Sequence, residues 1–215
     1  MEGATSDQLV REIRALASQC SVNFDEEVVH KLSCYVELVT KWQRISNLTG
    51  SPNSLEFIRT QVVDVIAVLP FINFKKLLDI GSGNGLPGIV LAIANEQSDI
   101  TLLESRSRRA RFLRQVQIEL GLTRVSVIND RLERLDKRVS PDTLVARAVA
   151  PLKDLTRACL PLIAKGATLV VMKSRLSDSE VKEAGELVKS TKVLPVLVPG
   201  YRERNLVFLR GKLEE

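Results

Sequence analysis

Histidine and cysteine are scarce in this chain of 215 residues, which limits the chemistry that it can perform. His30 is the one histidine, so a site with several histidine ligands is excluded, and a histidine-based triad could use only this residue. The three cysteines, Cys20, Cys34 and Cys159, are far apart and form no Cys-x-x-Cys pair. The sequence therefore indicates neither a disulfide scaffold nor a metal site.

Long apolar runs are missing as well. Nowhere do about 18 apolar residues follow one another, so no membrane span is expected. The start of the chain has no basic segment followed by an apolar run, which argues against a signal peptide and predicts a cytoplasmic protein. Proline and glycine are few, at 8 and 11 residues, and hydrophobic residues make up 45% of the chain. This composition is typical of a globular domain, and the net charge of +5 is compatible with a polyanionic partner.

Two patterns divide the sequence and predict its organisation. Up to about residue 70, apolar residues recur at spacings of three and four, as in Leu9, Ile13 and Leu16, which predicts amphipathic helices. From about residue 75, short β-branched runs alternate with helical stretches, which predicts a mostly parallel sheet with helices on both faces. We therefore expect a helical cap over residues 1–72 and an α/β domain over residues 73–215, together forming one compact unit.

The expected strands and helices alternate regularly in the second part. The strands cover residues 77–80, 100–103, 125–128, 143–146, 167–172, 193–198 and 206–209, and the helices cover residues 87–95, 107–120, 152–164 and 178–190. Only a few residues join the last two strands, too few for a parallel crossover. These strands are therefore expected to pair as an antiparallel hairpin at the edge of the sheet.

The most specific local motif is the segment Leu78–Gly88, which reads Leu-Asp-Ile-Gly-Ser-Gly-Asn-Gly-Leu-Pro-Gly. It follows a predicted strand and precedes a predicted helix, at the place where open α/β sheets bind their ligands. Glycines here let a ligand approach the backbone closely, and the start of the helix offers free N–H groups. A P-loop is excluded, because no Lys-Ser/Thr pair follows the glycines.

Two acidic residues bear on the identity of the ligand. The segment Gly83–Gly88 matches the dinucleotide pattern G-x-G-x-x-G, but a carboxylate at Asp79 would oppose an anionic pyrophosphate. Asp-x-Gly-x-Gly at the end of a first strand resembles motif I of the class I S-adenosylmethionine methyltransferases. Glu104, at the end of the second strand, is placed to hydrogen-bond ribose hydroxyls, which either cofactor would offer. A ligand-free tight turn and an NAD-dependent oxidoreductase remain the alternatives.

Several separate segments together resemble one family. They are Lys41-Trp42, Asn47-Leu48-Thr49, Leu78–Ile89, Arg111-Phe112-Leu113-Arg114-Gln115-Val116, Ala146-Arg147-Ala148 and Arg204-x-Leu206-Val207. From about residue 28 to residue 210, the chain is similar to the glucose-inhibited division protein B family. This resemblance implies a Rossmann-like class I methyltransferase fold with a helical cap, and S-adenosylmethionine as the cofactor. It also implies methylation of guanine N7 in the 530 loop of bacterial 16S ribosomal RNA.

The resemblance further implies roles for individual residues. The cofactor-binding residues expected in and near the glycine-rich segment are Asp79, Gly81, Gly83, Gly85, Leu86 and Glu104. Leu132 and Glu133 match the segment that contacts the adenosine half of the cofactor, and Arg147 matches a cofactor- and substrate-side arginine. The chain departs from the family pattern at Gln61, Ser174 and Asn205, so roles of the histidines and the glycine usual at these positions do not carry over.

Methylation at N7 makes few demands on side chains. Guanine N7 has an available lone pair, so no general base is needed and the enzyme mainly aligns the reacting atoms. Arg147 and Lys173, at the ends of two predicted strands, are the positioning candidates, because Arg and Lys can hydrogen-bond guanine O6. They could equally pair with Asp79 or Asp154. Cys159 lies within a predicted amphipathic helix and is expected to be buried and inert.

Positive charge is concentrated in the helix predicted after Glu104. Arg108 and Arg111 share one face of this helix, and we expect that face to follow RNA phosphates. The predicted RNA-binding set also contains Arg147, Lys173 and Arg204, and the expected partner is 16S ribosomal RNA or a precursor of the small ribosomal subunit. A solvated helix face is the structural alternative. The functional alternatives are a methyltransferase of another substrate class and a non-catalytic RNA-binding module.

Overall fold

The computed structural model describes residues 4–46, 53–136, 138–147, 150–200 and 202–211. The family-motif residues Asn47, Leu48, Thr49 and Ala148 lie outside the described residues. No helix within these ranges is long and apolar enough to cross a membrane. The same ranges hold no group of three or more His, Cys, Asp or Glu side chains arranged to bind a metal ion.

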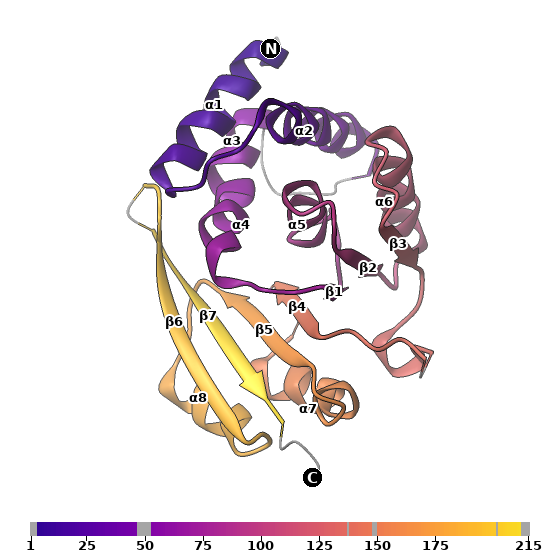
Figure 1. The fold of residues 1–215 in the computed structure, drawn as a ribbon, viewed down its shortest axis with the longest axis vertical. Helices are drawn as coiled ribbons and strands as arrows, with labels where there is room; N and C mark the ends of the chain where they lie inside the picture. Colours follow the sequence, from indigo (N-terminus) through magenta and orange to yellow (C-terminus); the bar gives the residue numbers. More distant parts are fainter. Residues whose placement is uncertain (1–3, 47–52, 137, 148–149, 201, 212–215) are drawn as a thin grey trace.

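The described strands form one seven-stranded sheet with the order β3-β2-β1-β4-β5-β7-β6 (Figure 1). The strands are β1 (Lys76–Ile80), β2 (Asp99–Leu103), β3 (Val125–Ile128), β4 (Thr143–Arg147), β5 (Thr168–Lys173), β6 (Ser190–Val198) and β7 (Arg202–Arg210). Strands β1 to β5 pair in parallel, whereas β7 runs antiparallel to both β5 and β6. The predicted parallel sheet and its antiparallel C-terminal hairpin are therefore confirmed.

The parallel register brings the carboxyl ends of five strands, β1 to β5, to one edge of the sheet. Ile80 of β1 lies beside Leu103 of β2 on one side and Ala146 of β4 on the other. At the end of β5, Lys173 pairs with Asn205 of β7. The strand order reverses between β1 and β4, so the segments that follow these strands converge where open α/β sheets form their ligand crevice.

Helices from the first part of the chain cover one face of the sheet (Figure 1). They are α1 (Ser6–Gln19), α2 (Glu26–Ser46), α3 (Ser54–Phe57), the π-helical turn η1 (Ile58–Val62), α4 (Val63–Val68) and the 3-10 turn η2 (Leu69–Phe71), and they pack with α5 (Gly88–Ala94) and α6 (Ser107–Glu119). Asp25 caps α2, since its Oδ1 accepts a hydrogen bond from the Val28 amide at 2.8 Å. Trp42 of α2 meets Phe112 of α6 edge-on, with ring centroids 5.5 Å apart. The helical cap and the sheet thus share one continuous core.

The opposite face is covered by α7 (Leu152–Ile163) and α8 (Asp178–Gly185), next to the 3-10 turn η3 (Leu132–Arg134). The helix predicted over residues 178–190 extended too far, because α8 ends at Gly185. The chain instead enters β6, where Ser190 pairs with Arg210 and the Lys189 amide donates to the Arg210 carbonyl at 2.9 Å. Pairing of β6 with β7 therefore outweighed the local helical pattern at the end of α8.

Candidate active site at the carboxyl edge of the sheet

The glycine-rich segment folds into a tight turn after β1. Gly81, Gly83 and Gly85 have φ angles of 68°, 58° and 98°, in the left-handed region that glycine adopts without strain. The turn is tied to the neighbouring strand, because the amides of Gly81 and Ser82 donate to the Leu103 carbonyl at 2.8 and 3.1 Å. These three glycines of the predicted cofactor set therefore shape the turn itself.

The cap holds this turn from the outside. The Tyr35 hydroxyl of α2, which is fully buried, donates to the Asn84 carbonyl at 2.8 Å. Gln61 of η1 accepts from the Asn84 side-chain amide at 3.4 Å. Sequence reasoning missed Tyr35, because a tyrosine on the apolar face of a helix reads as core packing. Only the crossing of α2 over the turn gives its hydroxyl a second role.

Asp79 lies beneath the turn and is completely buried. Its Oδ2 accepts a hydrogen bond from the Gly88 amide at 3.0 Å, and a Cβ on Gly88 would lie 2.5 Å from that oxygen. Burial raises the pKa of Asp79 to about 7, further raised by the nearby Glu104 and opposed by Ser82, Gly88 and Arg147. Gly88 thus permits the close approach of helix α5 that the buried carboxylate needs.

The raised pKa of Asp79 predicts a pH-dependent stability. The folded protein holds the Asp79 proton up to about pH 7, whereas the unfolded chain loses it near the ordinary value of 3.8. More protons are bound in the folded state across this interval, so the contribution of Asp79 to stability is lost as the pH rises from 4 to 7. Relative to Asp79→Asn, the wild type should lose up to about 1.4 kcal/mol of unfolding free energy per pH unit. Urea unfolding of both proteins between pH 4 and 8 measures this, and a pH-independent difference would contradict it.

Glu104 joins the turn to the start of α6. Its Oε2 accepts from the Gly83 amide at 2.9 Å, and its Oε1 accepts from the Arg106 amide at 2.8 Å. The Glu104 side chain is buried. A carboxylate oxygen has a second lone pair, so these backbone hydrogen bonds leave capacity for hydroxyl groups of a ligand.

On the other side of the strand-order reversal, two predicted arginines meet a carboxylate of the cap. Arg204 of β7 donates from Nε to Asp64 Oδ2 at 2.9 Å, and Arg147 Nη2 lies 3.5 Å from the same oxygen. Asp64 belongs to α4, and it is the only charged residue of that otherwise apolar helix. The structure therefore brings Arg147 and Arg204 together, through a residue that was not among the predicted site residues.

Lys173 lies at the same edge but has a different partner. It forms an ion pair with Glu180 of α8, rather than with Asp79 or Asp154 as the sequence allowed. Asp154 instead lies 3.6 Å from Arg157, one turn further along α7. The hydrogen bond with Lys173 holds the pKa of Glu180 below its ordinary value. Lys173 is thus held on the α8 side of the edge.

The remaining predicted site residues lie on α6, on η3 and at the end of the glycine turn. Arg108 and Arg111 are exposed on α6, while Phe112 of the same helix is buried. Leu132 is half-buried and Glu133 exposed in η3, and Leu86 is buried at the end of the glycine turn. The arginine face of α6 thus begins directly after Glu104, next to the turn.

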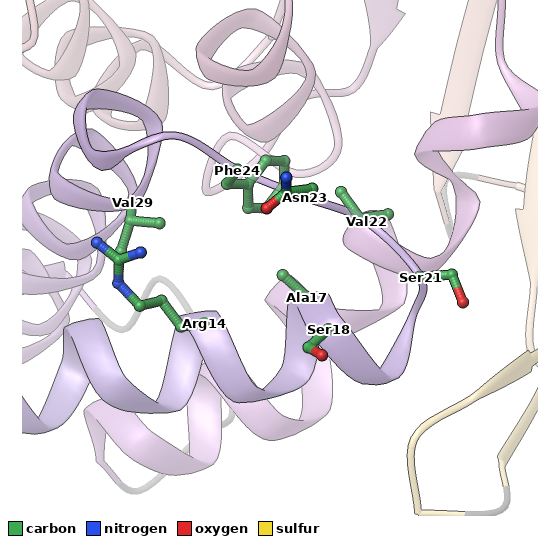
Figure 2. A pocket seen from close by; sticks show the side chains of 8 residues that line it. All are labelled: Arg14, Ala17, Ser18, Ser21, Val22, Asn23, Phe24 and Val29. Carbon is green, nitrogen blue, oxygen red and sulfur yellow. The ribbon is translucent and has the colours of Figure 1, made fainter.

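Cys159 and one cavity lie apart from these residues. Cys159 is buried in α7, and burial raises the pKa of its thiol to about 12, which keeps it protonated and inert. A cavity of about 330 Å³ lies in the cap, between α1 and the segment that leads to α2, and Figure 2 shows the side chains that line it. Arg14, Ser18 and Phe24 are among its lining residues, and none of the predicted site residues lines it.

Comparison with known proteins places the chain among ribosomal RNA methyltransferases. A model of the GidB family, described as rRNA small subunit methyltransferase G, matches residues 28–207. The ribosomal RNA small subunit methyltransferase G of Nitrosococcus oceani is 36% identical over 192 residues, covering 89% of this chain and 90% of the relative. The protein of the same name from Aliivibrio fischeri is 35% identical over 207 residues, covering 95% and 98%.

Solved structures share the architecture. A putative O-methyltransferase from Klebsiella pneumoniae has a TM-score of 0.56 at 12% identity, covering 96% of this chain and 99% of that one. A mutant of MtNAS in complex with S-adenosylmethionine has a TM-score of 0.53 at 17% identity, covering 98% and 93%. At such identities these likenesses show the fold, and the strand order is that of the class I methyltransferases. The family model and the similarity to these two relatives together show that the chain belongs to the GidB family of rRNA small subunit methyltransferases.

Proposed function

We propose that this protein transfers the methyl group of S-adenosylmethionine to N7 of a guanine in the 530 loop of 16S ribosomal RNA. The observation that carries the proposal is the left-handed glycine turn, flanked by the carboxylates of Asp79 and Glu104, in a chain of the GidB family. An enzyme with this substrate would act in the cytoplasm, where bacterial ribosomes are assembled.

The residues around the turn fit the proposed cofactor. Asp79 Oδ1 is buried and has no hydrogen-bond partner within the described residues, so a cationic group such as the methionine ammonium, bound at the turn, would stabilise the carboxylate form of Asp79. Glu104 keeps lone pairs for ribose hydroxyls, and Leu132 and Glu133 stand on the adenosine side. When bound, S-adenosylmethionine supplies an electrophilic methyl group on a sulfonium.

The side chains at the edge are suited to alignment rather than to proton transfer. Guanine N7 attacks with its own lone pair, so the chain needs no general base, and holding the reacting atoms in line can contribute about 7–11 kcal/mol. Arg147, beside the turn, and Lys173, at the end of β5, are the proposed positioning residues for the base. Each offers N–H donors that suit the O6 acceptor of guanine.

The arginine face of α6 is the proposed contact with the RNA backbone. Arg108 and Arg111 are exposed and follow the Glu104 turn, so RNA phosphates bound there would lie beside the cofactor. The RNA could be free 16S RNA or RNA within a precursor of the small subunit, and both belong in the test.

Methyl transfer with a defined acceptor atom tests the proposal. Purified protein and radiolabelled S-adenosylmethionine are incubated with free 16S RNA and with small subunits that lack the modification. Methylated N7 then makes the strand cleavable by borohydride and aniline, which locates the guanine. We expect label and cleavage in the 530 loop, and no label in a loop fragment carrying 7-deazaguanine. If the protein binds the cofactor but leaves every form of the RNA unmethylated at N7, the proposed acceptor is refuted. If the protein binds RNA but not the cofactor, it is a non-catalytic module.

A further inference from the structure

A buried carboxylate of the cap lies between two arginines of the sheet. Asp64 has a side-chain exposure of 2%, whereas those of Arg147 and Arg204 are 22% and 18%. One oxygen, Oδ2, lies within ion-pair distance of both guanidinium groups, at 3.5 and 2.9 Å. The two arginines thus converge on a single atom, although they come from strands separated by β5.

This cluster stands at the functional edge of the sheet. Arg147 is the last residue of β4, next to β1 at the reversal of strand order. Arg204 directly precedes Asn205, the partner of Lys173 at the end of β5. Asp64 reaches this edge because α4 follows η1, whose Gln61 contacts Asn84 of the glycine turn. One short stretch of the cap therefore contacts both the glycine turn and the end of β4.

The geometry restricts how each arginine can point. A guanidinium has five N–H donors in a rigid plane, and Arg204 uses Nε toward Asp64 and Nη1 toward the Glu203 carbonyl at 3.0 Å. Because the guanidinium is planar and rigid, fixing these two nitrogens also fixes the orientation of Nη2 of Arg204. Two arginines with one carboxylate also leave a net positive charge, which suits the acceptor-rich edge and phosphates of a nucleotide.

We propose that Asp64 is a positioning residue, which aims Arg147 and Arg204 at the target guanine nucleotide and so makes the cap part of substrate recognition. The inference rests on the proposed function, because it assigns the nucleotide to the same edge. Asp64 itself stays buried and touches neither the substrate nor the cofactor. Its effect is transmitted through the orientation of the two guanidinium groups.

Asp64→Asn tests the inference, because it removes the charge and keeps the shape. Titration with S-adenosylhomocysteine counts the folded sites, so that kcat is expressed per site and partial unfolding is corrected for. We expect the KM for RNA to rise about tenfold and kcat per site to fall about tenfold. A merely structural role would reduce only the number of sites. RNA binding by fluorescence anisotropy gives a readout that does not require methyl transfer, so failure of the proposed function would be seen separately, as an inactive wild type.

Asp142→Asn is the matched control. Asp142 is a carboxylate at the opposite edge, whose Oδ2 accepts from the amides of Lys75 and Lys76 at 2.9 and 2.8 Å. This variant should keep KM and kcat per site unchanged. The double variant Asp64→Asn, Arg204→Gln restores the net charge of the cluster and should stay at least tenfold impaired in kcat/KM. Wild-type RNA affinity and kinetics in Asp64→Asn, or full recovery in the double variant, would overturn the inference.

Discussion

Gly85→Ala should weaken binding of S-adenosylmethionine by about 100-fold. A Cβ at this position would lie 2.7 Å from Ile89 Cγ1 and 3.3 Å from the Tyr35 hydroxyl, in a residue with a φ of 98°. For an alanine, overpacking costs about 2 kcal/mol and the left-handed backbone conformation costs about 1 kcal/mol. The turn can release this strain only by changing its conformation, and the changed turn binds the cofactor less well. Isothermal titration with S-adenosylmethionine measures the loss.

Gly121→Ala is the control for the backbone contribution alone. Gly121 also has a positive φ, of 62°, but nothing lies within 4 Å of its Cβ position. This variant should lose about 1 kcal/mol of unfolding free energy and bind the cofactor as the wild type does. Equal affinities in the two variants would show that the crowded turn is not the cofactor site. A loss in Gly85→Ala with an unchanged thermal melt would locate the effect in binding.

Reversing two charges on α6 should weaken RNA binding by about 100-fold at low salt and leave cofactor affinity unchanged. Arg108 and Arg111 are exposed in the first half of α6, the helix that follows Glu104. If each contacts one phosphate of a single-stranded loop, the double variant Arg108→Glu, Arg111→Glu should reduce the slope of log K against log salt by about 1.4. Filter binding of a 530-loop RNA across a salt series measures both quantities.

Lys189→Glu, Lys192→Glu provides the matched change of charge elsewhere. Both lysines are exposed near the start of β6, at the end of the sheet opposite to the glycine turn. The net charge of the protein changes equally in the two double variants, so a general electrostatic effect would weaken both alike. An RNA affinity and salt slope that fall to the same extent in both would remove α6 from the interface.

Much of the fold could be predicted because local pattern and tertiary structure agree. Leu9, Ile13 and Leu16 are buried along one face of α1, as their spacing indicates. Asp25 caps α2 because its short side chain accepts a hydrogen bond from a free amide in the first turn of the helix. The exception is the end of α8, since the predicted hairpin is longer than its local pattern indicated and β6 already begins at Ser190, which pairs with Arg210.

The candidate site divides in the same way. Spacing alone placed Asp79 and Glu104 beside the glycine turn, because strand ends and turn glycines are features of neighbouring residues. The contact of Tyr35 with Asn84 and the partner of Lys173 were not predictable, because each joins elements whose relative position is set by packing. Side chains with several available partners take the one that the packed helices bring near.

The sequence by itself determined the alternating sheet, the glycine turn and the resemblance to the GidB family, and its single histidine excluded a site with several histidine ligands. These follow from composition and from residues close together along the chain. Only the tertiary structure decided that Asp64 of the cap meets Arg147 and Arg204, which lie far from it in sequence. Burying a charge is costly unless it is paired, and the partners of Asp64 come from strands distant in sequence, so its role is a property of the assembled fold.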